Sequence, residues 1–318
     1  MQQILSYFYV FKDEKIYYKP MTKMKNTVLF VLCFPFFLFA QELEAPIISH
    51  ETGFYTDAFE LTMEHEDADA TILFTWDGSV PKIENVNGQV WHYKKQYPAL
   101  PTDELGELLN DTIRTFTYSS PVHISLEKVN HYSEVAVSMF ENEEYRTLKE
   151  DANVPIFKSV VMRAVAYKDG EYSEVITKNY LIDELGKSRF SLPVVALTVP
   201  PEEFYDYENG IYVPGKKFDD WRTENVGDVA NRWSETNYSE KGSSTEKEIN
   251  FTYIVDGKEE LNHGAGIRLN GNTSRIYPNK SIRLYAKSGY GEKNFKYPFF
   301  EGDEANEFKR LILRNSGQ

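Results

Sequence analysis

Three Asp-Gly pairs, each following a short strand-like run, indicate the fold class of this chain. The pairs are Asp77-Gly78, Asp169-Gly170 and Asp256-Gly257, and the runs before them are rich in β-branched and aromatic residues. Asp-Gly favours the tight turn of a β-hairpin, because glycine adopts positive φ and aspartate accepts hydrogen bonds from nearby backbone. The runs in the first half of the chain lack the helical period of amphipathic helices. The sequence therefore predicts a mainly β protein with antiparallel sheets.

Residues 1–40 have the composition of an export signal. A short basic region beginning at Met24 precedes an apolar run over residues 27–40, whose length suits a signal peptide and is short for a membrane span. We predict a signal peptide over residues 1–40, with the true start at Met21 or Met24; an uncleaved anchor is the alternative. The mature protein would then be exported, whether secreted, periplasmic or at the cell surface, without strong membrane association.

Charge and cysteine content exclude several functions. The net charge is −14, and it becomes −17 without the first forty residues, which carry five lysines and two acidic residues. Such a surface repels nucleic acid, so we expect no nucleic-acid partner. The one cysteine, Cys33, lies in the apolar N-terminal run, which leaves the rest of the chain without a disulfide, a thiolate nucleophile or a cysteine zinc site. The histidines lack metal-binding spacing, and we predict no metal ligands.

Residues 45–183 are predicted to form the first domain, an antiparallel β-sandwich. Strands are expected at residues 59–63, 71–76, 160–167 and 175–182. An insertion over residues 85–153 interrupts them, and a short helix is expected within it at residues 102–109. Four ring-bearing residues of the insertion fit either packing within the loop or an aromatic platform for a sugar: Trp91, His92, Tyr93 and Tyr97.

Three motifs in the first domain are typical of a known family. They are GFY at residues 53–55, ILFTWDGSVP at residues 72–81, and MRAVA at residues 162–166 followed by Ser173. The domain resembles the chitobiase/β-hexosaminidase C-terminal domain, although Phe74 replaces the family's usual tyrosine. The resemblance implies an immunoglobulin-like β-sandwich without catalytic residues, of the kind appended to secreted, carbohydrate-related proteins. It makes glycan a candidate partner.

A polar linker at residues 184–190 leads into the second domain, residues 191–318. Strands are expected at residues 192–199, 248–255 and 308–313, one helical turn at 202–205, and a polar loop or lid at 216–248. Two further strands, at residues 266–270 and 280–285, alternate apolar and polar residues and flank a polar loop.

The loop between these last two strands is the main candidate site. It contains Gly271, Asn272, Thr273, Ser274 and Arg275, and Lys280 and Arg283 follow it. Loop N–H groups and fixed cations can surround a phosphate or another anion. The residues alone also fit a hairpin loop without a ligand, because Asn-Thr stands where a P-loop has Lys-Ser/Thr and a strand, not a helix, is expected to follow.

Five motifs in the second domain carry a second resemblance. They are LPVVAL at residues 192–197, GIYV at 210–213, GIRLNGNTSR at 266–275, PNKSIRL at 278–284 and FKRLILRN at 308–315. In this order and spacing they resemble the bacterial spore-coat protein H (CotH) kinase family over residues 191–318. Asn279 stands where the family usually has a lysine.

The resemblance implies an atypical, α+β kinase-like fold that transfers phosphate from ATP to protein. Gly271, Asn272, Thr273, Ser274 and Arg275 would lie near the nucleotide phosphates, and Lys280 would pair with a phosphate. ATP and Mg²⁺ would be the cofactors, and a protein or a cell-surface molecule the substrate. These roles agree with the chemistry of phosphoryl transfer, which depends on charge neutralisation around the phosphates.

The family's acidic catalytic residues lie downstream of the Leu-Arg-Asn strand, so they are expected beyond Gln318 and are not identified in this chain. We therefore expect the N-terminal part of a truncated kinase-like domain that is inactive alone. Whether the chain is an enzyme is left open. The alternative function is a secreted binding or structural module that recognises glycan or protein through its β-sandwich.

Overall fold

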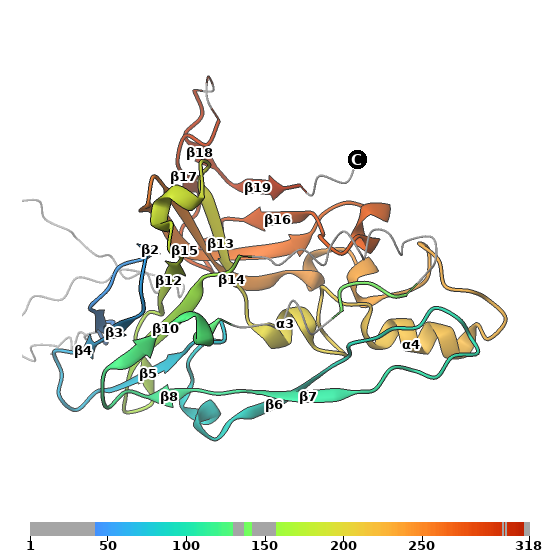
Figure 1. The fold of residues 1–318 in the computed structure, drawn as a ribbon, viewed down its shortest axis with the longest axis horizontal. Coiled ribbons are helices and arrows are strands. Elements are labelled where there is room, and N and C mark those ends of the chain that lie inside the picture. The colour runs from blue at the N-terminus through green and yellow to red at the C-terminus, as the bar shows by residue number, and fades with distance from the viewer. Residues whose placement is uncertain (1–41, 130–136, 142–156, 301, 303, 315–318) are drawn as a thin grey trace, which may run out of the picture. The chain divides into compact units, whose positions relative to one another are not determined.

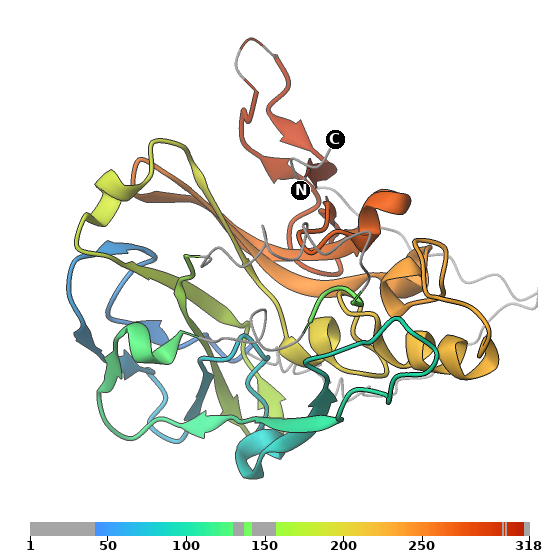
Figure 2. The same cartoon turned by 45° about the vertical axis from the view of Figure 1, so that its right-hand side comes forward.

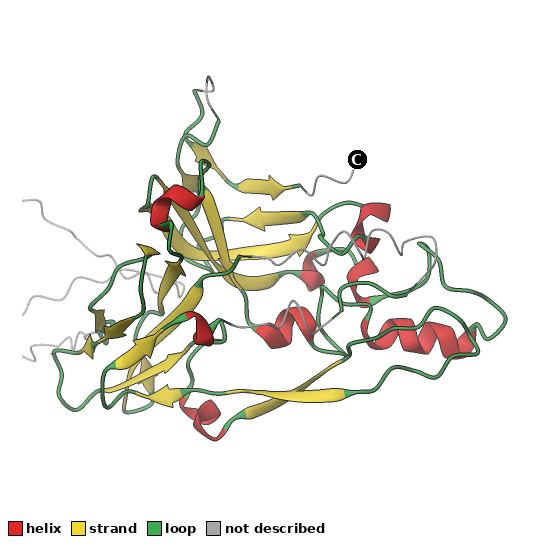
Figure 3. Cartoon of the chain, viewed as in Figure 1, coloured by secondary structure: helices red, strands yellow, loops and turns green. Residues whose placement is uncertain are grey.

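Strands dominate the chain, as its β-branched and aromatic runs predict. The computed structural model describes residues 42–129, 137–141, 157–300, 302 and 304–314, and within them the strands form two larger sheets and several two-stranded ribbons (Figures 1 and 3). Helices in this part of the chain are short (Figure 3). The expected mainly β fold is confirmed, whereas the predicted signal peptide, residues 1–40, lies outside the described residues.

The first sheet has the strand order β2-β12-β10-β5-β8, with β11 paired to β10. Its strands are β2 (Gly53–Tyr55), β5 (Thr71–Thr75), β8 (Phe116–Thr117), β10 (Val160–Lys168), β11 (Glu171–Tyr172) and β12 (Ile176–Ile182). The strands predicted at residues 71–76, 160–167 and 175–182 are confirmed with small differences at their ends. Asp169 and Gly170 both adopt positive φ and form the expected turn between β10 and β11.

The strand predicted at residues 59–63 is two strands with different partners. β3 (Phe59–Leu61) pairs with β9 (Val122–Ile124), and β4 (Met63–Glu64) pairs with β1 (Ile47–Ile48). These ribbons pack against one face of the first sheet. The buried cluster between them includes Leu61, Met63, Phe74, Met162 and Tyr180.

The insertion at residues 85–153 forms a ribbon where it is described. η1 (Ile83–Asn87) leads into β6 (Gln89–Tyr93), which pairs with β7 (Leu109–Ile113) (Figure 1). The helix predicted at residues 102–109 is wrong. Gly106 lies so close to Gln96 that a Cβ on it would be 2.2 Å from the Gln96 carbonyl oxygen. Only glycine permits this approach, so the segment packs closely on neighbouring backbone instead of coiling into a helix.

The second sheet is antiparallel throughout, in the order β13-β14-β15-β16-β19. Its strands are β13 (Val194–Thr198), β14 (Lys247–Val255), β15 (Lys258–Leu269), β16 (Ile282–Tyr285) and β19 (Arg310–Leu313). Asp256 and Gly257 have φ of 49° and 82° and form the predicted hairpin turn between β14 and β15. The strand predicted at residues 308–313 is divided between β19 and β18 (Glu307–Phe308), which pairs with β17 (Phe295–Lys296).

The second half of the chain contains a helix that was not predicted. α3 (Pro201–Tyr205) matches the expected helical turn, but α4 (Gly215–Glu224) occupies the start of the segment expected to be a loop. α4 buries Phe218 together with the charged residues Asp219 and Arg222, so its buried face lacks the apolar pattern that indicates a helix. Short turns follow at η5 (Asn237–Ser239) and η6 (Ser243–Thr245). Within the described ranges, no helix has both the length and the apolar composition of a membrane span.

Polar side chains join the two sheets. Asn179 on β12 donates to the Thr252 hydroxyl (3.1 Å), and Asn262 on β15 donates to the Thr177 carbonyl (2.8 Å). The described residues pack as one compact unit, in which each sheet keeps its own buried apolar cluster. The expected linker contains η4 (Gly186–Arg189), and the division into two domains stays a prediction.

Candidate functional site

The predicted loop lies between β15 and β16 and contains η7 (Thr273–Ile276). Gly271 has φ of 96°, and a Cβ there would be 2.3 Å from the Ser274 hydroxyl, so the tight turn requires glycine. Gly271, Asn272 and Thr273 are exposed, whereas Ser274 is half-buried and Arg275 is buried. The loop therefore presents its first residues to solvent and directs Arg275 into the protein.

Arg275 is a buried cation held by backbone carbonyls. Its guanidinium donates to the carbonyl oxygens of Leu269 (2.9 Å), Gly271 (2.9 Å), Tyr238 (3.2 Å) and Glu240. Burial lowers the pKa of Arg275, and the nearby charge of Arg283 lowers it further. The guanidinium thus ties the start of the loop to the segment around η5.

Lys280 is the second buried cation, with 5% of its surface exposed. Its ammonium donates to three carbonyl oxygens, those of Ser138 (2.7 Å), Arg275 (2.7 Å) and Tyr277 (3.0 Å). Burial, together with the charge of Arg275, holds the pKa of Lys280 well below its usual value. An ammonium has three hydrogens, so these carbonyls use all of them.

Two buried cations therefore lie beneath the exposed loop. In the described part of the chain, neither Arg275 nor Lys280 donates to a carboxylate. The Lys280 ammonium lies 4.1 Å from the ring centroid of Tyr238 and 5.3 Å from that of Tyr212, which adds cation–π attraction. The low dielectric of the interior screens the two charges less than water would, so their field reaches the loop surface.

Two cations nearer the surface hold the loop's asparagine side chains. Lys241 is exposed and donates to Asn272 (2.8 Å), and Arg283 is half-buried and donates to Asn270 (2.7 Å). Of these, Lys241 had no sequence motif to single it out. The structure thus brings the predicted residues together in two layers: residues 271–274 form the surface, and Arg275 and Lys280 form the support. Direct phosphate contact by Lys280 would require it to release a carbonyl.

The insertion supplies a wall of this site that sequence reasoning missed. Ser138 accepts from Lys280, and its hydroxyl donates to the Pro278 carbonyl (3.0 Å). Phe140 stacks on Phe218 of α4 with ring centroids 4.7 Å apart. The buried cluster around this stack also contains Tyr97, Met139, Tyr238, Leu269 and Ile276. The described part of the insertion lies beside α3 and α4 in both views (Figures 1 and 2).

Two of the four ring-bearing residues singled out in the insertion serve packing, whereas His92 is exposed and Tyr93 is half-buried. Trp91 and Tyr97 are 3% and 0% exposed, so they cannot form an open sugar platform, and the packing interpretation is confirmed for them. Lys94 forms a buried ion pair with Asp219 of α4, and the Tyr207 hydroxyl also donates to Asp219 (2.8 Å). These contacts anchor the β6–β7 ribbon to the second half of the chain.

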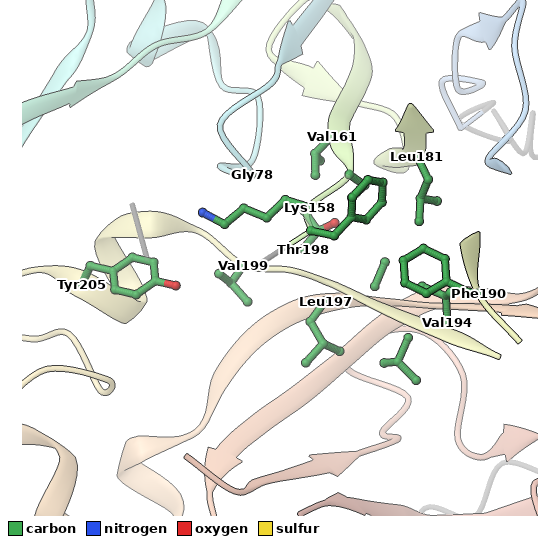
Figure 4. Close-up of a pocket in the computed structure, with 14 residues that line it drawn as sticks. Gly78, Lys158, Val161, Leu181, Phe190, Val194, Leu197, Thr198, Val199 and Tyr205 are labelled. Atoms are coloured by element: carbon green, nitrogen blue, oxygen red, sulfur yellow. The ribbon is translucent and has the colours of Figure 1, made fainter. Parts of the chain in front are cut away.

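A cavity of about 380 Å³ lies between the first sheet and β13 (Figure 4). Val161 and Leu181 line it from the first sheet, and β13 lines it from the second. No residue of the candidate loop contributes to its wall. It is a concave site separate from the loop.

The loop residues fit a phosphate, because they combine N–H groups with cations. Mg²⁺ would need oxygen ligands, usually carboxylates. Within the described residues, no cluster of three or more histidine, cysteine or acidic side chains is placed to hold a metal ion. No family model matches the chain, and comparisons with curated proteins and with solved structures find no significant match.

Proposed function

We propose that this chain is part of an exported CotH-type kinase-like protein that binds the phosphates of ATP at residues 271–275. The proposed fold is an immunoglobulin-like β-sandwich followed by the N-terminal part of an α+β kinase-like domain. The observation that carries the proposal is the pair of buried cations, Arg275 and Lys280, beneath the exposed loop. Burying one such charge costs several kcal/mol. Adjacent like charges also perturb each other's pKa, and perturbed pKa values are typical of functional sites.

In this proposal the exposed residues contact the phosphates and the buried cations act at a distance. The first N–H groups of a helical turn have no partner within the turn, so those of η7 can donate to phosphate oxygens. Lys241 and Arg283 would exchange the neutral Asn272 and Asn270 side chains for a charged phosphate, which forms stronger hydrogen bonds. Arg275 and Lys280 would strengthen the attraction while remaining bound to their carbonyls.

The proposal assigns no catalytic residue to this chain. Phosphoryl transfer needs a carboxylate near the acceptor hydroxyl, and the described residues identify none in that role. Activity of the whole protein on a protein or cell-surface substrate rests on the family resemblance. The glycan alternative has less support, because two of its candidate platform residues, Trp91 and Tyr97, are 3% and 0% exposed.

Equilibrium binding of ATP to the full chain, with and without Mg²⁺, tests the proposal. Lys241→Ala should weaken binding about tenfold, because a hydrogen bond to a charged group contributes about 1.5 kcal/mol. Lys258→Ala is the matched control, since Lys258 is exposed at the opposite end of β15 and should not affect affinity. The proposal fails if the folded chain does not bind ATP or if both variants weaken binding equally. Phosphate transfer by the chain alone would contradict its expected inactivity.

A further inference from the structure

Three cations from three segments of the chain gather around the ring of Tyr285 on β16. The guanidinium carbon of Arg268 on β15 lies 4.7 Å from the ring centroid, and that of Arg310 on β19 lies 5.6 Å from it. The Lys287 ammonium, from just beyond β16, lies 5.3 Å away. The three strands are neighbours in the second sheet (Figure 1), so the backbone fixes this arrangement. We call Tyr285 and these three cations the Tyr285 cluster.

The register of the sheet places the cluster on its polar face. Tyr285 pairs with Gly266 on β15 and with Arg310 on β19, so the three lie in one row. Arg268 lies two residues from Gly266, and side chains two residues apart point to the same side of a strand. The alternate residue Leu284 points the opposite way, into the apolar cluster of the second sheet. The Tyr285 cluster therefore lies on the face that does not form this core.

The Tyr285 cluster has more positive than negative charge. Glu246, whose side chain is 4% exposed, accepts from Arg268 (2.8 Å) and from Lys287, so one carboxylate serves two cations. The exposed Arg310 guanidinium forms no ion pair with any residue that the structure describes. Glu248 lies in the same row on β14, but it is exposed and two strands from Tyr285, or about 10 Å, where salt screens its charge. Three cations and one contacting carboxylate leave an excess of two positive charges.

This gathering of cations is unfavourable for folding by itself. Arg268 also lies directly opposite Arg283 across β15 and β16, and like charges in that position destabilise a sheet. The chain has a net charge of −14, so acidic residues are abundant, yet cations predominate here. A bound anion would relieve the repulsion, which favours an anionic ligand from outside the chain.

We propose that the Tyr285 cluster binds the phosphoryl group of a phosphate monoester. Two guanidinium groups and an ammonium supply donors, and a guanidinium can donate two parallel hydrogen bonds to phosphate. A phosphate monoester carries a charge of about −2 at neutral pH, which matches the excess charge of the cluster. All three cations lie within 5.6 Å of one ring centroid, so the site fits one compact group better than a long polyanion. It does not depend on ATP binding at the loop, because the loop and Tyr285 lie at opposite ends of β16 and share no residue of their sites.

Calorimetric titration of the full chain with phosphoserine tests the proposal. Arg310→Gln, at an exposed position, should weaken binding about tenfold, because it removes charge-assisted hydrogen bonds. Arg114→Gln is the matched control: Arg114 is exposed just beyond β7, and the variant should bind as the wild type does. Lys241→Ala at the loop should also leave this affinity unchanged. Serine O-sulfate, which has a similar shape but a single negative charge, should bind more weakly than phosphoserine.

A comparison of three probes identifies the source of the phosphoryl group. The probes are inorganic phosphate, phosphoserine and a short peptide that contains phosphoserine. Tighter binding of the peptide than of phosphoserine supports a phosphorylated protein as the ligand, and equal binding of the two supports a small phosphate ester. The proposal is overturned if no probe binds the folded chain, if the Arg310 and Arg114 variants bind equally, or if the sulfate ester binds as tightly as phosphoserine. Loss of binding in Lys241→Ala would place the phosphate at the loop and would also overturn it.

Discussion

Replacing Lys280 by methionine removes the buried ammonium and keeps a side chain of similar length. The carbonyl oxygens of Ser138, Arg275 and Tyr277 would lose their donor. A buried acceptor without a partner costs about 1 kcal/mol at the low end of the range, so the three together cost about 3 kcal/mol. Relief of the repulsion between Lys280 and Arg275 acts in the opposite direction. We therefore expect the free energy of unfolding to fall by about 2 kcal/mol.

Thermal and urea unfolding of the full chain measure this change. For a chain of this size, the expected loss corresponds to a fall in Tm of about 4 °C. Lys241→Met is the matched control, because Lys241 is exposed and donates to one side chain, and such surface changes alter stability by less than about 0.5 kcal/mol. If Lys280→Met is as stable as the control but no longer binds ATP, then Lys280 contacts phosphate directly and its supporting role is wrong.

Three further substitutions test other parts of the structure. Phe140→Ala should lower the free energy of unfolding by about 3 kcal/mol, because it removes one ring of a buried stack. The control, Phe300→Ala at an exposed site, should change it little. Equal effects of the two substitutions would argue against packing of the insertion on α4. Asp219→Asn should lower the free energy of unfolding in urea by about 3 kcal/mol, because it leaves Lys94 as an unpaired buried charge. Adding Lys94→Met should recover much of this lost stability. If the double variant recovers none of it, the ion pair is not the cause. Burial raises the pKa of Glu202 to about 7 from 4.5, so the folded chain holds a proton that the unfolded chain releases. This stabilisation is complete below pH 4.5 and is lost as pH rises through 7, so the free energy of unfolding should fall with pH over this range. Glu202→Gln should remove this pH dependence in unfolding measured between about pH 5 and 8. An unchanged pH dependence would assign it to other groups.

Local chemistry explains which elements the sequence predicts. Asp169-Gly170 and Asp256-Gly257 form the expected turns, because turn geometry depends on a few adjacent residues. α4 is different, since its buried face includes Asp219 and Arg222, whose partners lie in the insertion. Charged residues are normally exposed, so burial that depends on distant partners leaves no recognisable apolar pattern.

The sequence predicted the residues of the candidate site but not their tertiary partners. Residues 271–275 and Lys280 are close in the sequence, and their composition indicated an anion site before any contact was known. Their partners were not predictable, because Ser138 is 142 residues from Lys280 and Tyr238 is 37 residues from Arg275. The composition of the loop showed that cations were present. Only the tertiary contacts show that Arg275 and Lys280 donate to backbone carbonyls and that Lys241 lies at the loop surface.

Amide hydrogen exchange across the loop, with and without ATP, tests its phosphate-binding role most directly. We predict slower exchange for the N–H groups of residues 271–274 when ATP binds, with no change in β13 or in the first sheet. Bound ATP that leaves exchange at these residues unchanged, or protects another part of the chain instead, would contradict the phosphate-binding role of the loop.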